Sequence, residues 1–235
     1  MDSPVVVVGG SGRVGGIVVR RLLELGERVR VVSRGRPRSS AVVVPGAALP
    51  GAEFHRGDVR EAYTLLEPLA RCSAVVYCVE PGTDESGPDR PETTMHTGVR
   101  NVLAAAAARG ASPHVVLVSQ LHATHHGHPL NAYGRLMDWR LAGEEAVRRS
   151  GLRYTVVRPG WLTDGSPLGR GVRLEQGDHG DGQVCRRDVA EACVQALYCP
   201  SADGLTFEMF NQAGPAPADW EQQFAALEWD QAPVA

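Results

Sequence analysis

The chain contains no lysine. All 24 residues in its lysine-plus-arginine total are arginine, within a sequence of 235 residues. A guanidinium stays charged, whereas a lysine amine loses its proton readily when its surroundings favour the neutral form. Any site that depends on a lysine is therefore excluded. Arginine without lysine, together with abundant alanine, glycine and valine, suggests a GC-rich bacterial genome.

The sequence also lacks any run of about 20 apolar residues, the length that a membrane-spanning helix needs. The apolar run at 5–8 has no basic segment before it and ends at glycine, so we expect no secretory signal. A net charge of -3 gives no basic signature of nucleic-acid binding. Five cysteines without C-x-x-C spacing fit reduced thiols. We therefore expect a cytoplasmic protein that acts on a small molecule.

Strand and helix patterns alternate along most of the chain. Apolar, β-branched runs predict strands at 5–8, 28–33, 53–56, 74–79, 114–119, 154–158 and 205–211, with a possible short strand at 41–44. Apolar residues at helical spacing predict helices at 14–25, 60–70, 92–109, 132–150, 187–197 and 219–227. The glycine-rich segment 163–183 is expected to form a loop or small hairpin.

This alternation predicts an α/β fold in which a doubly wound parallel sheet carries helices on both faces. No repeat or second hydrophobic unit is evident, so we expect a single domain over 1–235. The segments 161–185 and 212–235 are expected to form a small C-terminal cap on the substrate side.

A glycine loop follows the first strand and opens the first helix. It reads Gly9, Gly10, Ser11, Gly12, Arg13, Val14, Gly15. In this context the first glycine permits a tight turn, the second lets the backbone approach a diphosphate, and the third allows close helix–strand packing. The phosphates would rest on free N–H groups at the helix N-terminus. The loop therefore predicts a dinucleotide site. The alternative is an ordinary glycine turn, which can have the same sequence.

The end of the second strand bears on which dinucleotide is bound. NAD-binding proteins usually carry Asp or Glu there, but this chain has Ser33 and Arg34, followed by Arg36 and Arg38. A guanidinium can grip a 2′-phosphate with two hydrogen bonds, and a carboxylate would repel it. Arg13 is expected to point toward the same region. The pattern favours NADP(H), with a solvated basic loop as the alternative.

Four stretches resemble the atypical short-chain dehydrogenase/reductases, a group with NmrA-like and NAD(P)H-binding members. They are VVVVGGSGRVG at 5–15, GDV at 57–59, HPLNAYGRLMDWRLAGEEAVRRSGLRYTVVRPGWL at 128–162 and CRRDVAEACVQAL at 185–197. The resemblance extends from residue 4 to about 211. It implies a Rossmann-type fold that binds NAD(P).

The resemblance also implies further cofactor residues. In such proteins Asp58 and Val59 would flank the adenine. The ends of the fourth and fifth strands, Cys78–Val79 and Ser119–Gln120, would line the cofactor. Pro159, Gly160 and Trp161 would lie beside the nicotinamide.

The catalytic pair of the superfamily, Tyr-x-x-x-Lys, is broken in this chain. Placing the motif on the only tyrosine in the predicted helix at 132–150 gives Tyr133 and Met137. Aligning instead on the Lys-x-x-x-Glu spacing before Ser150 gives Arg140 and Glu144, with Leu136 in place of the tyrosine, and this longer match is preferred.

On one helix face, Tyr133 could reach substrate or be structural. Arg140 could bind the nicotinamide ribose, or pair with Glu144 at i,i+4. Ser119 could hydrogen-bond substrate or cap a loop. These three residues are the catalytic candidates.

Four histidines fall within seven residues after Ser119: His122, His125, His126 and His128. One of them could supply a proton to substrate, since histidine titrates near neutral pH. No carboxylate or cysteine lies among them and the spacing matches no standard zinc pattern, so no metal site is predicted. A polar surface loop is the alternative.

Three functions are compatible with these features. The first is an NADPH-dependent oxidoreductase that reduces a small organic carbonyl or enone without the Tyr–Lys pair. The second is a non-catalytic NADP(H)-sensing protein of NmrA type. The third is an isomerase, dehydratase or cyclase on the same fold. Trp161, Leu162, Tyr133 and His128 suggest a flat or partly aromatic substrate. The oligomeric state cannot be deduced from these features.

Overall fold

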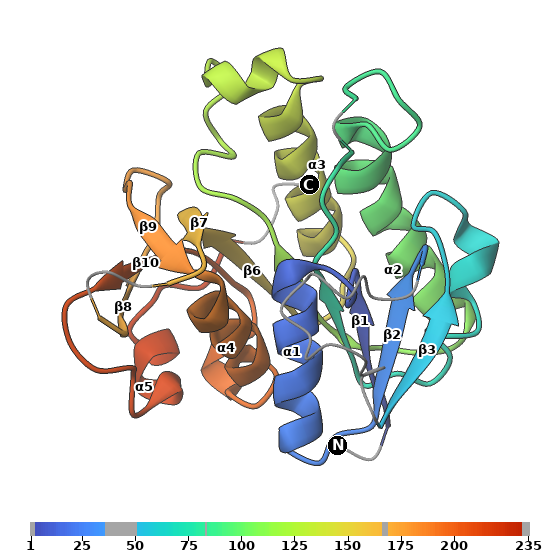
Figure 1. Ribbon diagram of the computed structural model, residues 1–235, viewed down its shortest axis with the longest axis horizontal. Coiled ribbons are helices and arrows are strands. Elements are labelled where there is room, and N and C mark those ends of the chain that lie inside the picture. Colours follow the sequence, from blue (N-terminus) through green and yellow to red (C-terminus); the bar gives the residue numbers. More distant parts are fainter. Residues whose placement is uncertain (1–2, 36–50, 83, 166–168, 232–235) are drawn as a thin grey trace.

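A computed structural model describes residues 3–35, 51–82, 84–165 and 169–231. The possible strand at 41–44 lies outside them. Eight strands form one sheet in the order β3-β2-β1-β4-β5-β6-β10-β8 (Figure 1). All neighbours are parallel except β10 and β8, which pair antiparallel. The α/β fold with a doubly wound sheet is confirmed.

Seven strands of this sheet follow the predicted runs closely. They are β1 (Val5–Val8), β2 (Val29–Ser33), β3 (Ala52–Arg56), β4 (Ala74–Tyr77), β5 (His114–Val118), β6 (Tyr154–Pro159) and β10 (Leu205–Gln212). The eighth, β8 (Gly171–Glu175), forms where no strand was predicted. The central strands are valine-rich because helices cover both faces.

Alternate residues of each strand serve two separate cores. Val5 and Val7 of β1 pack with α1 (Arg13–Glu24) and α4 (Arg186–Ala196) on one face. Val6 and Val8 pack on the other face, in the same core as buried residues of α2 (Gly98–Ala108) and Val147 of α3 (Leu136–Arg148). In Figure 1, α1 and α4 lie side by side. Within the described ranges, each helix is too short or too polar to cross a bilayer.

Two helix predictions were wrong in part. Only the 3-10 turn η1 (Ala62–Leu65) forms within 60–70, because Pro68 offers no N–H and restricts the residue before it. The segment 92–109 begins as the π-helical η2 (Glu92–Thr97) before α2 continues. The Tyr77 hydroxyl donates to the Thr94 carbonyl at 2.5 Å, so that carbonyl bonds outside the helix.

The predicted helix over 132–150 was also wrong at its start. The chain forms the 3-10 turn η3 (Pro129–Ala132), and α3 begins only at Leu136. Gly134 and Arg135 between them have φ of 52° and 58°. This left-handed backbone cannot continue a right-handed helix.

The glycine-rich segment 163–183 is more ordered than predicted. It contributes β8 to the main sheet, and β7 (Trp161–Thr163) pairs parallel with β9 (Gln183–Cys185) beside it. Helix α5 (Trp220–Ala225) buries Trp220 and Phe224 against the core that α4 shares. The division into one domain with two cap segments stays a prediction.

Candidate functional site

The glycine loop between β1 and α1 is tightly built. Gly9 has φ +82°, which favours glycine, and a Cβ there would lie 2.6 Å from the Cys78 carbonyl oxygen. A Cβ at Gly15 would overlap the Gly9 carbonyl oxygen. Only glycine at both positions lets β1, β4 and α1 approach this closely.

Helix α1 begins beside this loop without a capping side chain. Its N-cap is Gly12, and its first turn contains no acidic residue. The first N–H groups of a helix have no intrahelical acceptor, and the helix dipole favours an anion at this end. This set of backbone donors fits the diphosphate of a dinucleotide.

A cleft of ≈ 420 Å³ opens at the carboxyl end of the sheet, over this loop. Ten of the predicted cofactor residues line it: Gly9, Ser11, Gly12, Arg13, Val14, Arg34, Asp58, Val59, Cys78 and Val79. Five others are described by the structure but lie outside its lining: Gly15, Ser119, Arg140, Pro159 and Gly160.

Pro159 and Gly160 have packing contacts. The Pro159 carbonyl accepts the Leu121 N–H at 3.1 Å, and a Cβ at Gly160 would overlap the Gly182 carbonyl oxygen. These contacts join the end of β6 to the loops that follow β5 and precede β9. A role for either residue beside nicotinamide stays a prediction.

Charged pairs occupy one end of the cleft. Arg34, at the end of β2, is 59% exposed and donates to Asp89 at 3.1 Å. Arg60 donates from Nε to Asp58 Oδ1 at 2.8 Å, and this interaction holds the pKa of the Asp58 carboxyl below its usual value. Arg36 and Arg38 lie outside the described residues. Two guanidinium groups, of Arg34 and Arg60, therefore lie within reach of a ligand in this part of the cleft.

Sequence reasoning missed several lining residues, among them Arg60, Glu80 and Arg186. Leu162, which the sequence suggested for the substrate side, also lines the cleft. Arg60 directly follows the GDV stretch and Arg186 lies in CRRDV, so a search for arginine beside those motifs could have found both. Glu80 carries no such signal, because only the arrangement of strand ends brings it to the cleft.

Arg140 is buried on α3 and pairs with Glu80 rather than with Glu144. Arg140 Nη2 donates to Glu80 Oε2 at 2.5 Å; the Arg140 side chain is 4% exposed and that of Glu80 is 59% exposed. The predicted alternative of an Arg140–Glu144 ion pair is wrong. Nε and Nη1 of Arg140 are buried without a hydrogen-bond partner. Glu80 lines the cleft, whereas Arg140 bonds to it from outside the lining.

Tyr133 is not on the helix face where the sequence placed it. It precedes the left-handed turn before α3, with φ -88° and ψ 84°, and its hydroxyl donates to the Gly82 carbonyl. The hydroxyl thus joins two loops above the carboxyl end of the sheet. The structure does not bring Tyr133 together with Arg140 as a tyrosine–cation pair.

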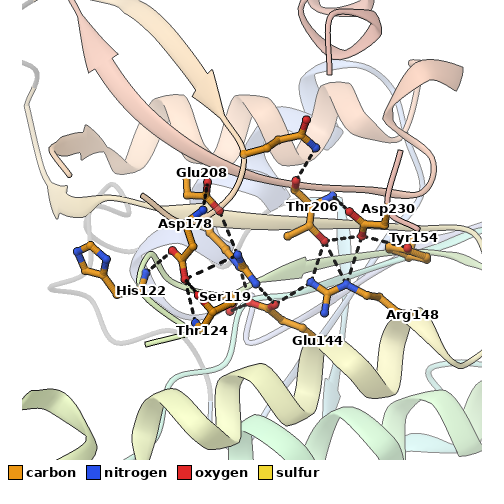
Figure 2. A network of polar contacts seen from close by, with 12 residues as sticks. Ser119, His122, Thr124, Glu144, Arg148, Tyr154, Asp178, Thr206, Glu208 and Asp230 are labelled. Atoms are coloured by element: carbon orange, nitrogen blue, oxygen red, sulfur yellow. Dashed lines mark hydrogen bonds and ion pairs between the residues drawn. The ribbon is translucent and has the colours of Figure 1, made fainter. Parts of the chain in front are cut away.

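Ser119 belongs to a buried polar network, shown in Figure 2. Its hydroxyl donates to Glu144 Oε1 at 2.5 Å. Arg158 donates to the two oxygens of Glu144 at 3.0 and 2.7 Å and to Glu208 at 3.1 Å. Glu144 also accepts from Arg148 at 2.9 Å. The network ties α3 to β5, β6 and β10, and it commits the Ser119 hydroxyl proton to Glu144.

The network continues to the histidine loop through Asp178 (Figure 2). This buried carboxylate accepts from the His122 N–H at 2.5 Å, and from the Thr124 N–H and hydroxyl at 2.9 and 2.8 Å. Burial opposes ionisation of Asp178, but the Thr124 donors and Arg158 hold the pKa of its carboxyl below its usual value. Asp178 therefore fixes the start of the loop.

The histidine rings stack on one another. His122 lies 4.9 Å from His125 and 5.2 Å from His128 between ring centroids, and His128 lies 6.5 Å from Trp161. Burial lowers the pKa of His128, and the two neighbouring imidazoles lower it further. Among the described residues, no group of three or more histidines, cysteines or carboxylates is placed to hold a metal ion.

The sequence matches the model of a family described as NAD(P)H-binding over residues 9–200. The chain belongs to this family. The expected membership of the atypical short-chain dehydrogenase/reductases is thereby confirmed, and with it a nicotinamide cofactor.

Several curated proteins are similar to the chain. An uncharacterized chloroplastic protein of Arabidopsis thaliana is 31% identical over 222 residues, 84% of this chain and 66% of that protein. Protein TIC 62 of Pisum sativum, also chloroplastic, is 30% identical over 86% of this chain. The chain spans only 41% of TIC 62. Sanguinarine reductase of Eschscholzia californica is 25% identical, with 95% of both chains covered.

Among solved structures, a putative NAD-dependent epimerase/dehydratase from Bacillus halodurans has a TM-score of 0.76 at 23% identity. The alignment covers 96% of this chain and 100% of that one. This likeness shows the Rossmann-type fold.

Proposed function

We propose that this protein is an NADPH-dependent reductase of a small organic carbonyl or enone. One observation carries the proposal: the cleft has an uncapped helix N-terminus on its floor and Arg34 at the end of β2. Within the described residues 29–35, β2 and its end carry arginine and no carboxylate. This arrangement favours the 2′-phosphate that distinguishes NADP(H) from NAD(H).

Different residues of the cleft would hold different parts of the cofactor. The glycine loop would hold the diphosphate, and Arg34, with Arg13 at the loop, would hold the 2′-phosphate. Asp58 and Val59 would flank the adenine, and Cys78 and Val79 would form the wall beyond it. When bound, the nicotinamide supplies the hydride.

Arg140 and Glu80 would together bind the nicotinamide ribose. Glu80 lines the cleft and can accept hydrogen bonds from ribose hydroxyls, while Arg140 fixes the position of the Glu80 carboxylate from behind. A guanidinium does not give up its proton, so Arg140 cannot replace a lysine in a proton relay. In this proposal Ser119 acts as a positioning residue, because its hydrogen bond to Glu144 ties the end of β5 to α3.

The substrate side is aromatic. Trp161 is 41% exposed, and Leu162 next to it lines the cleft. Together with the histidine stack, they favour a flat or partly aromatic substrate, to which a ring of the loop could give the proton. Sanguinarine reductase, a relative over nearly its whole length, supports a reductase on this scaffold.

A second candidate is a non-catalytic NADP(H) sensor. Tyr133 is committed to the Gly82 carbonyl and lies outside α3, so the site lacks the usual tyrosine–lysine geometry. In this case the protein would signal through cofactor occupancy rather than turnover. Bound NADP(H) would change the protein's surface and thereby its binding to a partner protein.

Hydride consumption separates the two candidates. Purified protein is incubated with NADPH and a panel of aldehydes, enones and quinones, and absorbance of the reduced nicotinamide is followed. Turnover of any of these acceptors supports the reductase. Tight NADPH binding without turnover of the panel, and with different affinities for NADPH and NADP⁺, would favour the sensor.

A further inference from the structure

The helices α1 and α4 both begin with an arginine at the same cleft. Arg13 is the first residue of α1 and Arg186 the first of α4, and both line the cleft. Helix α1 follows β1, and α4 precedes β10, which runs parallel to β6, so both helices start at the carboxyl edge of the sheet. They lie side by side in Figure 1, joined by an Arg21–Glu191 ion pair of 2.9 Å.

A helix N-terminus is an unfavourable place for a cation, because the dipole is positive there. The N-caps Gly12 and Cys185 make no side-chain hydrogen bond that would reduce this charge. Arg186 is only 8% exposed, so water compensates it little. The acidic residue in the first turn of α4, Asp188, instead accepts from Asn211 at 2.9 Å and Arg170 at 3.2 Å. This setting favours a strongly charged anion in the cleft.

The counter-ion that Arg186 has is weak. Its Nη1 donates to Asp164 at 2.7 Å, and the Asp164 side chain is 74% exposed, just after β7. An exposed carboxylate is solvated and screened, so such a pair contributes little. One bond to Asp164 also uses only one of the five N–H donors of the guanidinium. A phosphate group could accept two of them at once.

We propose that Arg186 is a further cofactor-binding residue that binds the diphosphate, and that Asp164 is the counter-ion it exchanges for phosphate. This inference rests on the proposed dinucleotide function. It makes Asp164 a competitor of the cofactor. It also couples cofactor binding to β7, whose Leu162 lines the cleft, and to the residues that directly follow it.

The first test is a calorimetric titration of Arg186→Gln with three ligands. NADPH and ADP-ribose contain a diphosphate, whereas 2′-AMP contains only the 2′-phosphate and adenosine. We expect Arg186→Gln to lower the affinity for NADPH and for ADP-ribose by roughly 10- to 100-fold, the effect of losing a hydrogen bond to a charged group. Binding of 2′-AMP should be unchanged, which also shows that the cleft is folded.

The matched control is Arg187→Gln, which removes the same charge one residue away. Arg187 is exposed and lines a different groove, between α1 and α4. We expect its affinity for all three ligands to equal that of the unmodified protein. An equal loss in both variants would mean a long-range charge effect and would overturn the proposal.

The second test concerns Asp164. We expect Asp164→Asn to bind NADPH and ADP-ribose several-fold more tightly, because a competing acceptor is lost, and to have no effect in the Arg186→Gln background. Unchanged affinity in Asp164→Asn would overturn the exchange. If the unmodified protein binds NADPH but Arg186→Gln binds equally well, only this inference fails. If the unmodified protein binds neither NADPH nor ADP-ribose, the proposed function fails with it.

Discussion

At the scale of single residues, Arg140 stands where the preferred alignment expects the lysine of the superfamily, and a guanidinium cannot take over proton transfer from a lysine. Its guanidinium is buried, two of its nitrogens have no acceptor, and the third bonds to Glu80. Sequence spacing offered two alternatives for Arg140, ribose binding or an ion pair with Glu144; the ion pair is wrong, and ribose binding stays a prediction. Glu80 follows a different strand, 60 residues earlier in the chain, and no local pattern reveals such a contact.

Arg140→Met should therefore leave the stability of the fold intact while weakening the binding of the cofactor. The remaining Glu80 is largely exposed and stays hydrated, and an apolar side chain has no unsatisfied donors to bury. We expect an unchanged or higher Tm by calorimetry and a higher Kd for NADPH. A large drop in Tm would show that the buried guanidinium stabilises the fold.

Arg34→Gln should change which nicotinamide dinucleotide is bound. We expect affinity for NADPH to fall roughly 10- to 100-fold, because a charged hydrogen bond to the 2′-phosphate is lost, while affinity for NADH stays constant. Arg109→Gln, an exposed charge at the end of α2, serves as the control. An equal loss of affinity for both cofactors would show that Arg34 does not bind the 2′-phosphate.

At the scale of elements, strands were easier to predict than helix ends. The valine runs of β1 and β4 are buried on both faces, so composition alone indicates them. The start of α3 was misplaced because Arg135 adopts a left-handed conformation that its residue type does not favour. The network around Glu144 joins β5, α3, β6 and β10, so its partners could not be read from local spacing.

Asp178→Ala should release the histidine loop. The carboxylate accepts the backbone N–H groups of His122 and Thr124, and His122 has φ 65°, a left-handed conformation that is uncommon outside glycine. We expect these two amides to exchange hydrogen much faster, measured by hydrogen–deuterium exchange, while β1 amides stay protected. Unchanged protection at both amides would mean that other contacts hold the loop.

At the scale of the whole molecule, the sequence predicted the α/β architecture because nearly every strand and helix carries its own pattern. The short edge strands β7, β8 and β9 were missed, since glycine-rich segments have weak strand propensity and depend on tertiary pairing. The bacterial source and the cytoplasmic location stay predictions, and two of the similar proteins are chloroplastic.

Stability should fall in mild acid through His114. Burial lowers the pKa of this side chain to about 4, from about 6.5 in an unfolded chain. Because the unfolded chain binds the proton more readily, His114 contributes its full stability above about pH 6.5 and loses it as the pH falls toward 4.

We expect the free energy of unfolding in urea to drop by about 2 kcal/mol between pH 7 and pH 5 through this group. His114→Gln cannot titrate and still can bond to Thr155, which His114 contacts at 3.0 Å. Its stability should depend less on pH over this range. An equal slope in both proteins would assign the acid sensitivity to other groups.

The central claim is that the cleft is built for NADP(H), and the most direct measurement is a fluorescence titration of the purified protein with NADPH and with NADH. The arrangement of the glycine loop, the α1 N-terminus and Arg34 predicts saturable binding of both, with at least about tenfold preference for NADPH. No binding of either cofactor, or a preference for NADH, would contradict it.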